Sequence, residues 1–146
     1  MEIVKMTDDH IAQVAQLEQL CFSSPWSVNA IAGELTNPLS CWLVAVDGGK
    51  VCGYVGSQAV LGEADMMNIA VEPACRRQGI ARQLVEQLIT ELKNANNYQL
   101  TLEVRASNTP AISLYAQMGF QQVGIRPRYY SKPTEDALIL RKEWEV

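Results

Sequence analysis

An apolar strand pattern followed by a strongly amphipathic helix pattern is the feature that most constrains the fold. Residues 65–72 (DMMNIAVE) are apolar on both faces, which predicts a central strand of a sheet. Pro73 ends this strand, and the segment 74–81 opens a helix that continues to about residue 93. The apolar face of that helix consists of Ala81, Leu84, Val85, Leu88 and Leu92.

Other strand and helix patterns lie on both sides of this unit. The predicted strands are 2–6, 41–46, 51–60, 99–105, 120–126 and 135–142. The predicted helices begin at the capping residues Thr7 or Asp8, Ser27, and Asn108 or Thr109. Gly119 follows the last helix as its C′ residue, and Asp47-Gly48-Gly49 predicts a hairpin turn. The order βααβββαβαββ predicts an α/β fold with a mixed sheet.

Length, charge and cysteine usage exclude several classes of protein. A chain of 146 residues with no linker-like tract predicts one domain, residues 1–146. Its net charge of −4 argues against direct nucleic-acid binding. One histidine and four cysteines without a C-x-x-C pair predict no metal site. The longest apolar stretch, 41–46, is too short for a membrane span, and the start does not resemble a signal peptide. We therefore expect the four cysteines to be reduced thiols in a cytoplasmic protein.

The turn at residues 76–81, where the helix that continues to about residue 93 opens, carries two arginines and a glycine. The first backbone N–H groups of a helix are unpaired and lie at the positive end of its dipole, so such a turn can bind an anion. Gly79 has no Cβ and would let the backbone approach a phosphate closely, with Arg76 and Arg77 adding charge. An exposed turn with solvated arginines explains these residues alone equally well. The turn matches neither a P-loop nor a Rossmann fingerprint.

Three further residues have both a structural and a functional interpretation. Glu103 lies on the polar face of the strand 99–105, Asn108 precedes a helix, and Tyr115 lies on that helix's apolar stripe. Their structural interpretations are an outward-facing strand residue, a helix cap, and a core aromatic whose hydroxyl finds a partner. Taken singly, these residues do not establish a site.

Together, however, the motifs resemble those of the GNAT superfamily of N-acetyltransferases over nearly the whole chain. The stretch NIAVEPACRRQGIARQLVEQL is similar to the acyl-CoA motif [QR]-x-x-G-x-[GA], with Arg76, Gly79 and Ala81 at the defined positions. The stretches LEVRASNTPAISLYAQMGF and RPRYYSKPTEDALIL resemble the RimI branch, which acetylates the N-terminal alanine of a small-subunit ribosomal protein. The resemblance implies a mostly antiparallel sheet with a splayed strand pair and helices on both faces.

The resemblance also implies a role for each matching position, with acetyl-CoA as co-substrate. The backbone of Ile69, Ala70 and Val71 would pair with the pantetheine amides. The pyrophosphate would lie on the backbone N–H groups of Arg77, Gln78, Gly79, Ile80, Ala81 and Arg82, next to Arg76. Asn108 would contact the CoA arm. Glu103 matches the general base and Tyr115 the general acid.

These roles agree with the chemistry of amine acetylation. An α-amino group, with a pKa near 7.7–8.0, is roughly one-tenth neutral at pH 7, whereas deprotonating a lysine costs roughly 3.4 kcal/mol more. A half-shielded glutamate can accept the proton, through a water if needed. A tyrosine hydroxyl can give the leaving thiolate a proton or a hydrogen bond, and an N–H near Val71 can polarise the thioester. Cys75 would lie at the phosphate end, which argues against an acetyl-carrying role.

The acceptor site is less clear from the sequence. Candidate walls are Trp26, Ser27, Tyr129 and Tyr130, and candidate acids for a basic peptide are Glu63, Asp65, Glu135 and Asp136. A solvated surface explains these acids equally well. The leading hypothesis is acetylation of an N-terminal alanine of a ribosomal protein. The alternatives are a lysine or small-amine acceptor, or a CoA-binding module without turnover, which would need neither Glu103 nor Tyr115.

Overall fold

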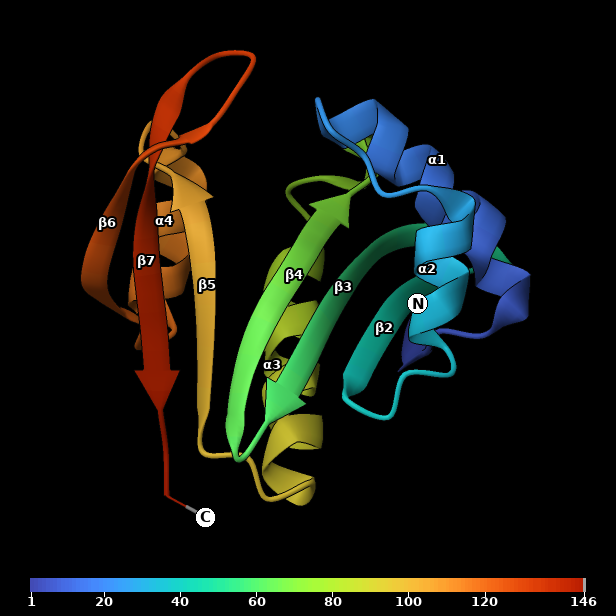
Figure 1. Ribbon diagram of the computed structural model, residues 1–146. Coiled ribbons are helices and arrows are strands. Elements are labelled where there is room, and N and C mark those ends of the chain that lie inside the picture. Colours follow the sequence, from blue (N-terminus) through green and yellow to red (C-terminus); the bar gives the residue numbers. More distant parts are fainter. Residues whose placement is uncertain (146) are drawn as a thin grey trace.

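Within residues 1–145, which the computed structural model describes, seven strands form one sheet in the order β1-β2-β3-β4-β5-β7-β6 (Figure 1). The strands are β1 (Glu2–Lys5), β2 (Ser40–Asp47), β3 (Lys50–Val60), β4 (Glu63–Val71), β5 (Gln99–Arg105), β6 (Gln121–Tyr130) and β7 (Glu135–Glu143). The α-helices are α1 (Ile11–Cys21), α2 (Val28–Glu34), α3 (Ile80–Asn94) and α4 (Thr109–Gln117). Two 3₁₀ turns, η1 (Asp8–His10) and η2 (Pro73–Cys75), complete the order, which is the one predicted from the sequence.

The neighbouring strands β4 and β5 are parallel and pair only at one end. Their register is limited to Glu63 with Gln99, Ala64 with Leu100 and Asp65 with Thr101, while all other neighbouring strands are antiparallel. Beyond Asp65 the two strands separate, as Figure 1 shows between the labels β4 and β5. The mostly antiparallel sheet with one splayed pair is confirmed.

Helices cover the two faces of the sheet unequally. On one face, α3 and α4 pack against the sheet, and the predicted α3 residues Leu84, Val85 and Leu88 are fully buried there. On the other face, α1 and α2 cover β2, β3 and β4 through a second core that contains Trp42 and Tyr54. No helix among residues 1–145 is long and apolar enough to cross a membrane.

The half of the sheet formed by β5, β7 and β6 has no helix on its second face (Figure 1). Leu100, Leu102 and Val104 of β5 point into the core with α3 and α4. Because side chains alternate along a strand, Thr101, Glu103 and Arg105 point to the uncovered face, where all three are half-buried. The fold therefore presents Glu103 on an open surface next to the gap between β4 and β5.

The predicted element boundaries differ from the structure by two residues or more at three places, and several others differ by one residue. Helix α3 begins at Ile80 and not within 74–79, because Arg77 and Gly79 have left-handed backbones, with φ of 66° and 75°, that a right-handed helix cannot contain. Strand β4 begins at Glu63, two residues early, and β6 continues to Tyr130 through an irregular segment. The caps at Ser27 and Asn108 and the C′ glycine at 119 are confirmed.

Candidate active site

The separating strands leave one edge of β4 without a strand partner. From Met66 to Val71, β4 pairs only with β3, so the backbone groups that point toward β5 have no partner strand. A β-bulge lies at the start of this segment, because Gly56 pairs with Asn68 and Ser57 with Met66, which leaves Met67 unpaired. An extended chain with amide groups, such as the pantetheine arm of CoA, fits an open strand edge of this kind.

The turn from β4 to α3 has the backbone of an anion site. Residues 77 and 79 both have positive φ, and turns of this type direct successive N–H groups to one side. The first helical hydrogen bond runs from Gln83 N to Gly79 O (3.1 Å), so the amides before Gln83 have no acceptor within the helix. A Cβ placed on Gly79 would meet only Gln83 Nε2, at 4.0 Å, so the space beside this glycine is open. This turn therefore fits a pyrophosphate group.

Two of the arginine side chains near this turn, those of Arg76 and Arg82, have partners inside the protein. Arg76 donates through Nε to Val71 O (3.3 Å) and contacts Cys21 Sγ through Nη2 (3.9 Å). Arg82 donates to Gln117 Oε1 (3.0 Å), which links α3 to α4. Backbone N–H groups are therefore the main candidates for holding an anion at this turn.

Asn108 and Cys75 have structural roles at the same end of the sheet. Asn108 Oδ1 accepts from Ala111 N (3.3 Å) and caps α4. A hydrogen bond with Cys52, with burial as the next contribution, raises the pKa of the Cys75 thiol to about 11. Cys75 is therefore a neutral thiol near pH 7 and a poor nucleophile, which agrees with its exclusion as an acetyl carrier.

Glu103 lies on β5 opposite Ile139 of β7, and its side chain is 27% exposed. Its Oε1 is 3.5 Å from Nε of Arg126, an exposed ion pair that costs little to separate. Its Oε2 is buried and has no hydrogen-bond partner within 3.5 Å among residues 1–145. The carboxylate nevertheless interacts with the Tyr129 hydroxyl, and after burial this interaction is the next contribution that raises the pKa of Tyr129. Because buried carboxylate oxygens normally have partners, this atom is a candidate proton acceptor beside the opening between β4 and β5.

Tyr115 is 4% exposed and packs edge-on against Phe120, with the ring centroids 5.5 Å apart. Burial, with a smaller contribution from Tyr130, raises the pKa of Tyr115 to about 12. Burial and the charge of Glu103 in turn raise the pKa of Tyr130 to about 12. Tyr130 is therefore close enough to both predicted catalytic side chains to interact electrostatically with each of them.

A buried carboxylate that the sequence analysis did not single out holds the neighbouring helix in place. Glu18 of α1 is fully buried and accepts from Trp26 N and Asn68 Nδ2, both at 2.8 Å, and from the Tyr54 hydroxyl. These bonds fix the segment between α1 and α2 to the bulged part of β4. The sequence does indicate that Glu18 is buried, because position 18 follows Val14 by four residues and so lies on the apolar face of the helix.

The acidic residues considered for the acceptor site mostly have partners of their own. Glu63 accepts from the Tyr98 hydroxyl (2.8 Å), Asp136 from Arg128 N (2.9 Å), and Glu135 from Arg105 and Ser107. Of the candidate walls, Trp26 packs edge-on against Trp42, with centroids 5.3 Å apart. In the described part of the chain, no group of three His, Cys, Asp or Glu side chains is arranged to hold a metal ion.

Known proteins are similar to this chain in sequence and in fold. The sequence profile of the Acetyltransferase (GNAT) family matches residues 11–120. The [ribosomal protein bS18]-alanine N-acetyltransferase of Salmonella typhimurium is 41% identical over 128 residues, covering 86% of this chain and 85% of its own. The N-alpha-acetyltransferase RimI of Mycobacterium tuberculosis is 36% identical over 136 residues, covering 88% and 84%. The crystal structure of the Escherichia coli ribosomal-protein-S18-alanine N-acetyltransferase superposes with a TM-score of 0.90 at 35% identity, covering 99% of this chain and 94% of that one.

Proposed function

The chain belongs to the GNAT family of acetyltransferases, and from this premise we propose that it acetylates the N-terminal alanine of a small-subunit ribosomal protein. The observation that carries the proposal is the buried, unpartnered Oε2 of Glu103, on the uncovered face beside the gap between β4 and β5. The relatives that act on the ribosomal protein bS18 match most of the chain, which supports this acceptor. The four cysteines are free thiols, and we place the reaction in the cytoplasm.

Acetyl-CoA supplies the acetyl group as an activated thioester. We assign its pantetheine arm to the open edge of β4 at Ile69, Ala70 and Val71, and its pyrophosphate to the amides of residues 77–82. Arg76 holds the end of β4 through Val71 O, and Asn108, which we assign to the CoA arm, also caps α4 through Ala111 N. A backbone N–H near Val71 polarises the thioester carbonyl.

Glu103 acts as the general base in this proposal. The incoming α-amino group loses its proton to Oε2, directly or through one water. The ion pair with Arg126 involves the other oxygen, Oε1. An α-amino group costs only about 1 kcal/mol to deprotonate at pH 7, whereas a lysine costs about 4.6 kcal/mol. A carboxylate base therefore favours an N-terminal amine over a lysine side chain.

Tyr115 serves the leaving thiolate as a hydrogen-bond donor. Its pKa of about 12 keeps the phenol protonated throughout the physiological range. Full proton transfer from such a phenol to a thiolate with the pKa of a cysteine thiol, near 8.5, is uphill by roughly 5 kcal/mol. We therefore assign Tyr115 the stabilisation of the thiolate by a hydrogen bond, and the thiol obtains its proton from solvent.

The deciding experiment uses a peptide with a free N-terminal alanine and one internal lysine. The peptide is incubated with the protein and acetyl-CoA, and fragment mass spectrometry locates the acetyl group. We expect it on the alanine amine. Acetyl on the lysine alone would agree with the assigned fold and co-substrate but would refute the N-terminal alanine as the acceptor. No transfer to either amine, with CoA still bound, would refute the alanine substrate and favour a CoA-binding role.

A further inference from the structure

The hairpin between β6 and β7 has little strand pairing at its closed end. The register passes from Arg126 with Ala137 directly to Tyr130 with Glu135, so residues 127–129 form no ladder pair with β7. Arg128 has a φ of 53°, and its backbone N–H bonds to the Asp136 side chain, not to a strand. Because the ladder is interrupted, side chains must supply much of what holds this hairpin in place.

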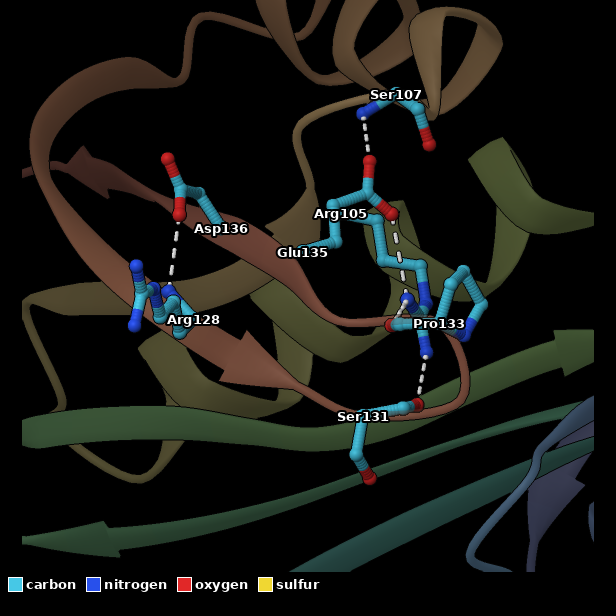
Figure 2. A network of polar contacts seen from close by, with 7 residues as sticks. All are labelled: Arg105, Ser107, Arg128, Ser131, Pro133, Glu135 and Asp136. Carbon is cyan, nitrogen blue, oxygen red and sulfur yellow. Dashed lines mark hydrogen bonds and ion pairs between the residues drawn. The ribbon is translucent and has the colours of Figure 1, made fainter.

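Arg105, the last residue of β5, makes most of these contacts (Figure 2). Its Nη1 donates to Pro133 O (2.9 Å) and to Glu135 Oε1 (3.3 Å), and its Nη2 donates to Ser131 O (3.1 Å). The guanidinium also lies over the Tyr130 ring, with Cζ 4.5 Å from the centroid. One planar, multidentate side chain thus binds two backbone carbonyls, one carboxylate and one aromatic ring of the same hairpin.

Glu135 extends this network to the start of α4. Its Oε2 accepts from Ser107 N (2.6 Å), in the turn just before the α4 cap. The hydrogen bond with Ser107 and the contact with Arg105 hold the pKa of Glu135 below its usual range. Glu135 is therefore ionised at neutral pH and joins β5, the hairpin and the α4 turn.

We propose that Arg105 and Glu135 are positioning residues that hold the β6–β7 hairpin, with Tyr130 against the Arg105 guanidinium, onto the elements that carry Glu103 and Tyr115, and so preorganise the acceptor side of the site. Each element joined by the network carries one of these groups: β5 carries Glu103, α4 carries Tyr115, and the hairpin carries Tyr130. The donors of Arg105 and the oxygens of Glu135 are engaged by the protein itself, so neither residue is a catalytic residue. This inference rests on the proposed acetylation of a peptide amine.

If the hairpin is already ordered in the free protein, acceptor binding does not lose free energy by ordering it. Loss of the network should therefore weaken acceptor binding more than it slows the acetyl transfer. The backbone site for CoA lies on β4 and α3, outside the network, and its affinity should not change. A KM effect without a matching kcat effect distinguishes positioning from a general loss of structure.

The test compares R105Q, R105K and E135Q with R128Q, which removes an equal charge from the same hairpin without removing a contact of the network. We expect R105Q to raise the KM for the alanine peptide about tenfold, as loss of one charge-assisted hydrogen bond would. R105K should recover part of this loss, and E135Q should raise KM about threefold. The R105Q/E135Q double variant should change less than the product of the two single effects. In all of them kcat and the Kd for CoA should stay near wild type.

Hydrogen exchange gives a second measurement that needs no substrate. The backbone amides of residues 131, 132 and 134–136 should exchange faster in R105Q, while those of the β2–β3 hairpin stay unchanged. Unchanged KM and unchanged exchange in a folded R105Q would overturn the proposal, as would a parallel loss of CoA binding and kcat. If R105Q does not fold, E135Q decides by the same criteria. A wild-type protein inactive on the alanine peptide would refute the proposed function, and the exchange result would still decide whether Arg105 holds the hairpin.

Discussion

The two halves of the candidate active site are built in different ways. The CoA half consists of one contiguous stretch, residues 69–82, and presents backbone groups from an open strand edge and a turn with positive φ. The proposed acceptor half consists of side chains from β5, α4 and the β6–β7 hairpin, which are distant in sequence. The first half depends on local conformation, and the second depends on how three elements are held against one another.

This difference determines which substitutions each half should tolerate. A backbone site is sensitive where a special φ is required and insensitive to most side-chain changes. A site built from side chains should lose function when a single atom is removed. The following predictions test this comparison in order of decreasing effect.

The largest expected effect is that of Glu103→Gln. The change removes the proton acceptor while preserving shape, so kcat should fall by roughly 10²–10⁴-fold, the range for loss of a general base. The Kd for acetyl-CoA should stay within a factor of about two, because Glu103 lies outside the backbone CoA site. Steady-state kinetics on the alanine peptide from pH 6 to 9, with CoA titration by calorimetry, measure both quantities.

The matched control for this variant is Glu86→Gln on α3, which removes the same charge from an exposed position. It should leave both kcat and Kd unchanged. Full turnover of Glu103→Gln across the whole pH range would show that another group accepts the proton. An equal loss of CoA affinity would show that the two halves are not separable at this residue.

Tyr115→Phe should have the next largest effect. Removal of one hydroxyl that bonds to a developing thiolate should lower kcat by roughly 10–100-fold. Because the pKa of Tyr115 is raised to about 12, the wild-type phenol stays protonated as pH rises through 10. Between pH 9 and 10.5, the kcat of the wild type and that of the variant should therefore depend on pH in the same way. A fall in the wild-type kcat alone, with a midpoint near 10, would contradict the burial of this hydroxyl.

Gly79→Ala probes the CoA half through its backbone. Holding a non-glycine residue at a φ of +75° costs about 1–2 kcal/mol, and the new Cβ would enter the open space assigned to the phosphates. We expect the Kd for CoA to rise about tenfold, with little change in kcat at saturating acetyl-CoA. Gly49→Ala is the control, because Gly49 has a φ of +84° with open space around it in the distant β2–β3 hairpin. An equal effect of both variants on CoA binding would rule out a specific role for Gly79.

The sequence predicted most of the fold, including the strand, turn and helix to which we assign CoA, because the determinants of these elements are local. The order of strands and helices, the caps at Ser27 and Asn108, and the glycine at 119 all follow from periodicity and capping within short windows. The position of Gly79 at the start of α3 could be predicted in the same way. The exact start of α3 could not, because the left-handed backbone of Arg77 has no signature in a non-glycine residue.

The acceptor half could be predicted only in part. Resemblance suggested Glu103 and Tyr115, but the proximity of Tyr130 to both depends on the register of β6. Two irregularities in β6, between Gln122 and Gly124 and between Arg126 and Tyr130, shift that register. Counting residues along an alternating strand cannot detect such shifts, since each added residue exchanges the two faces. The network of Arg105 and Glu135 was missed for the same reason.

The smallest expected effect is that of Arg76→Gln, although Arg76 occupies a defined position of the acyl-CoA motif. In the structure its guanidinium bonds to Val71 O and Cys21 Sγ on an exposed surface, while the turn at residues 77–79 supplies the groups assigned to the pyrophosphate. Glutamine can still donate to Val71 O, and the motif itself accepts Gln at this position. The Kd for CoA should therefore rise less than about threefold, within the range for one exposed ion pair. A rise comparable to that of Gly79→Ala would mean that the guanidinium turns toward the phosphates when CoA binds, and the CoA half would then depend on a side chain as the acceptor half does.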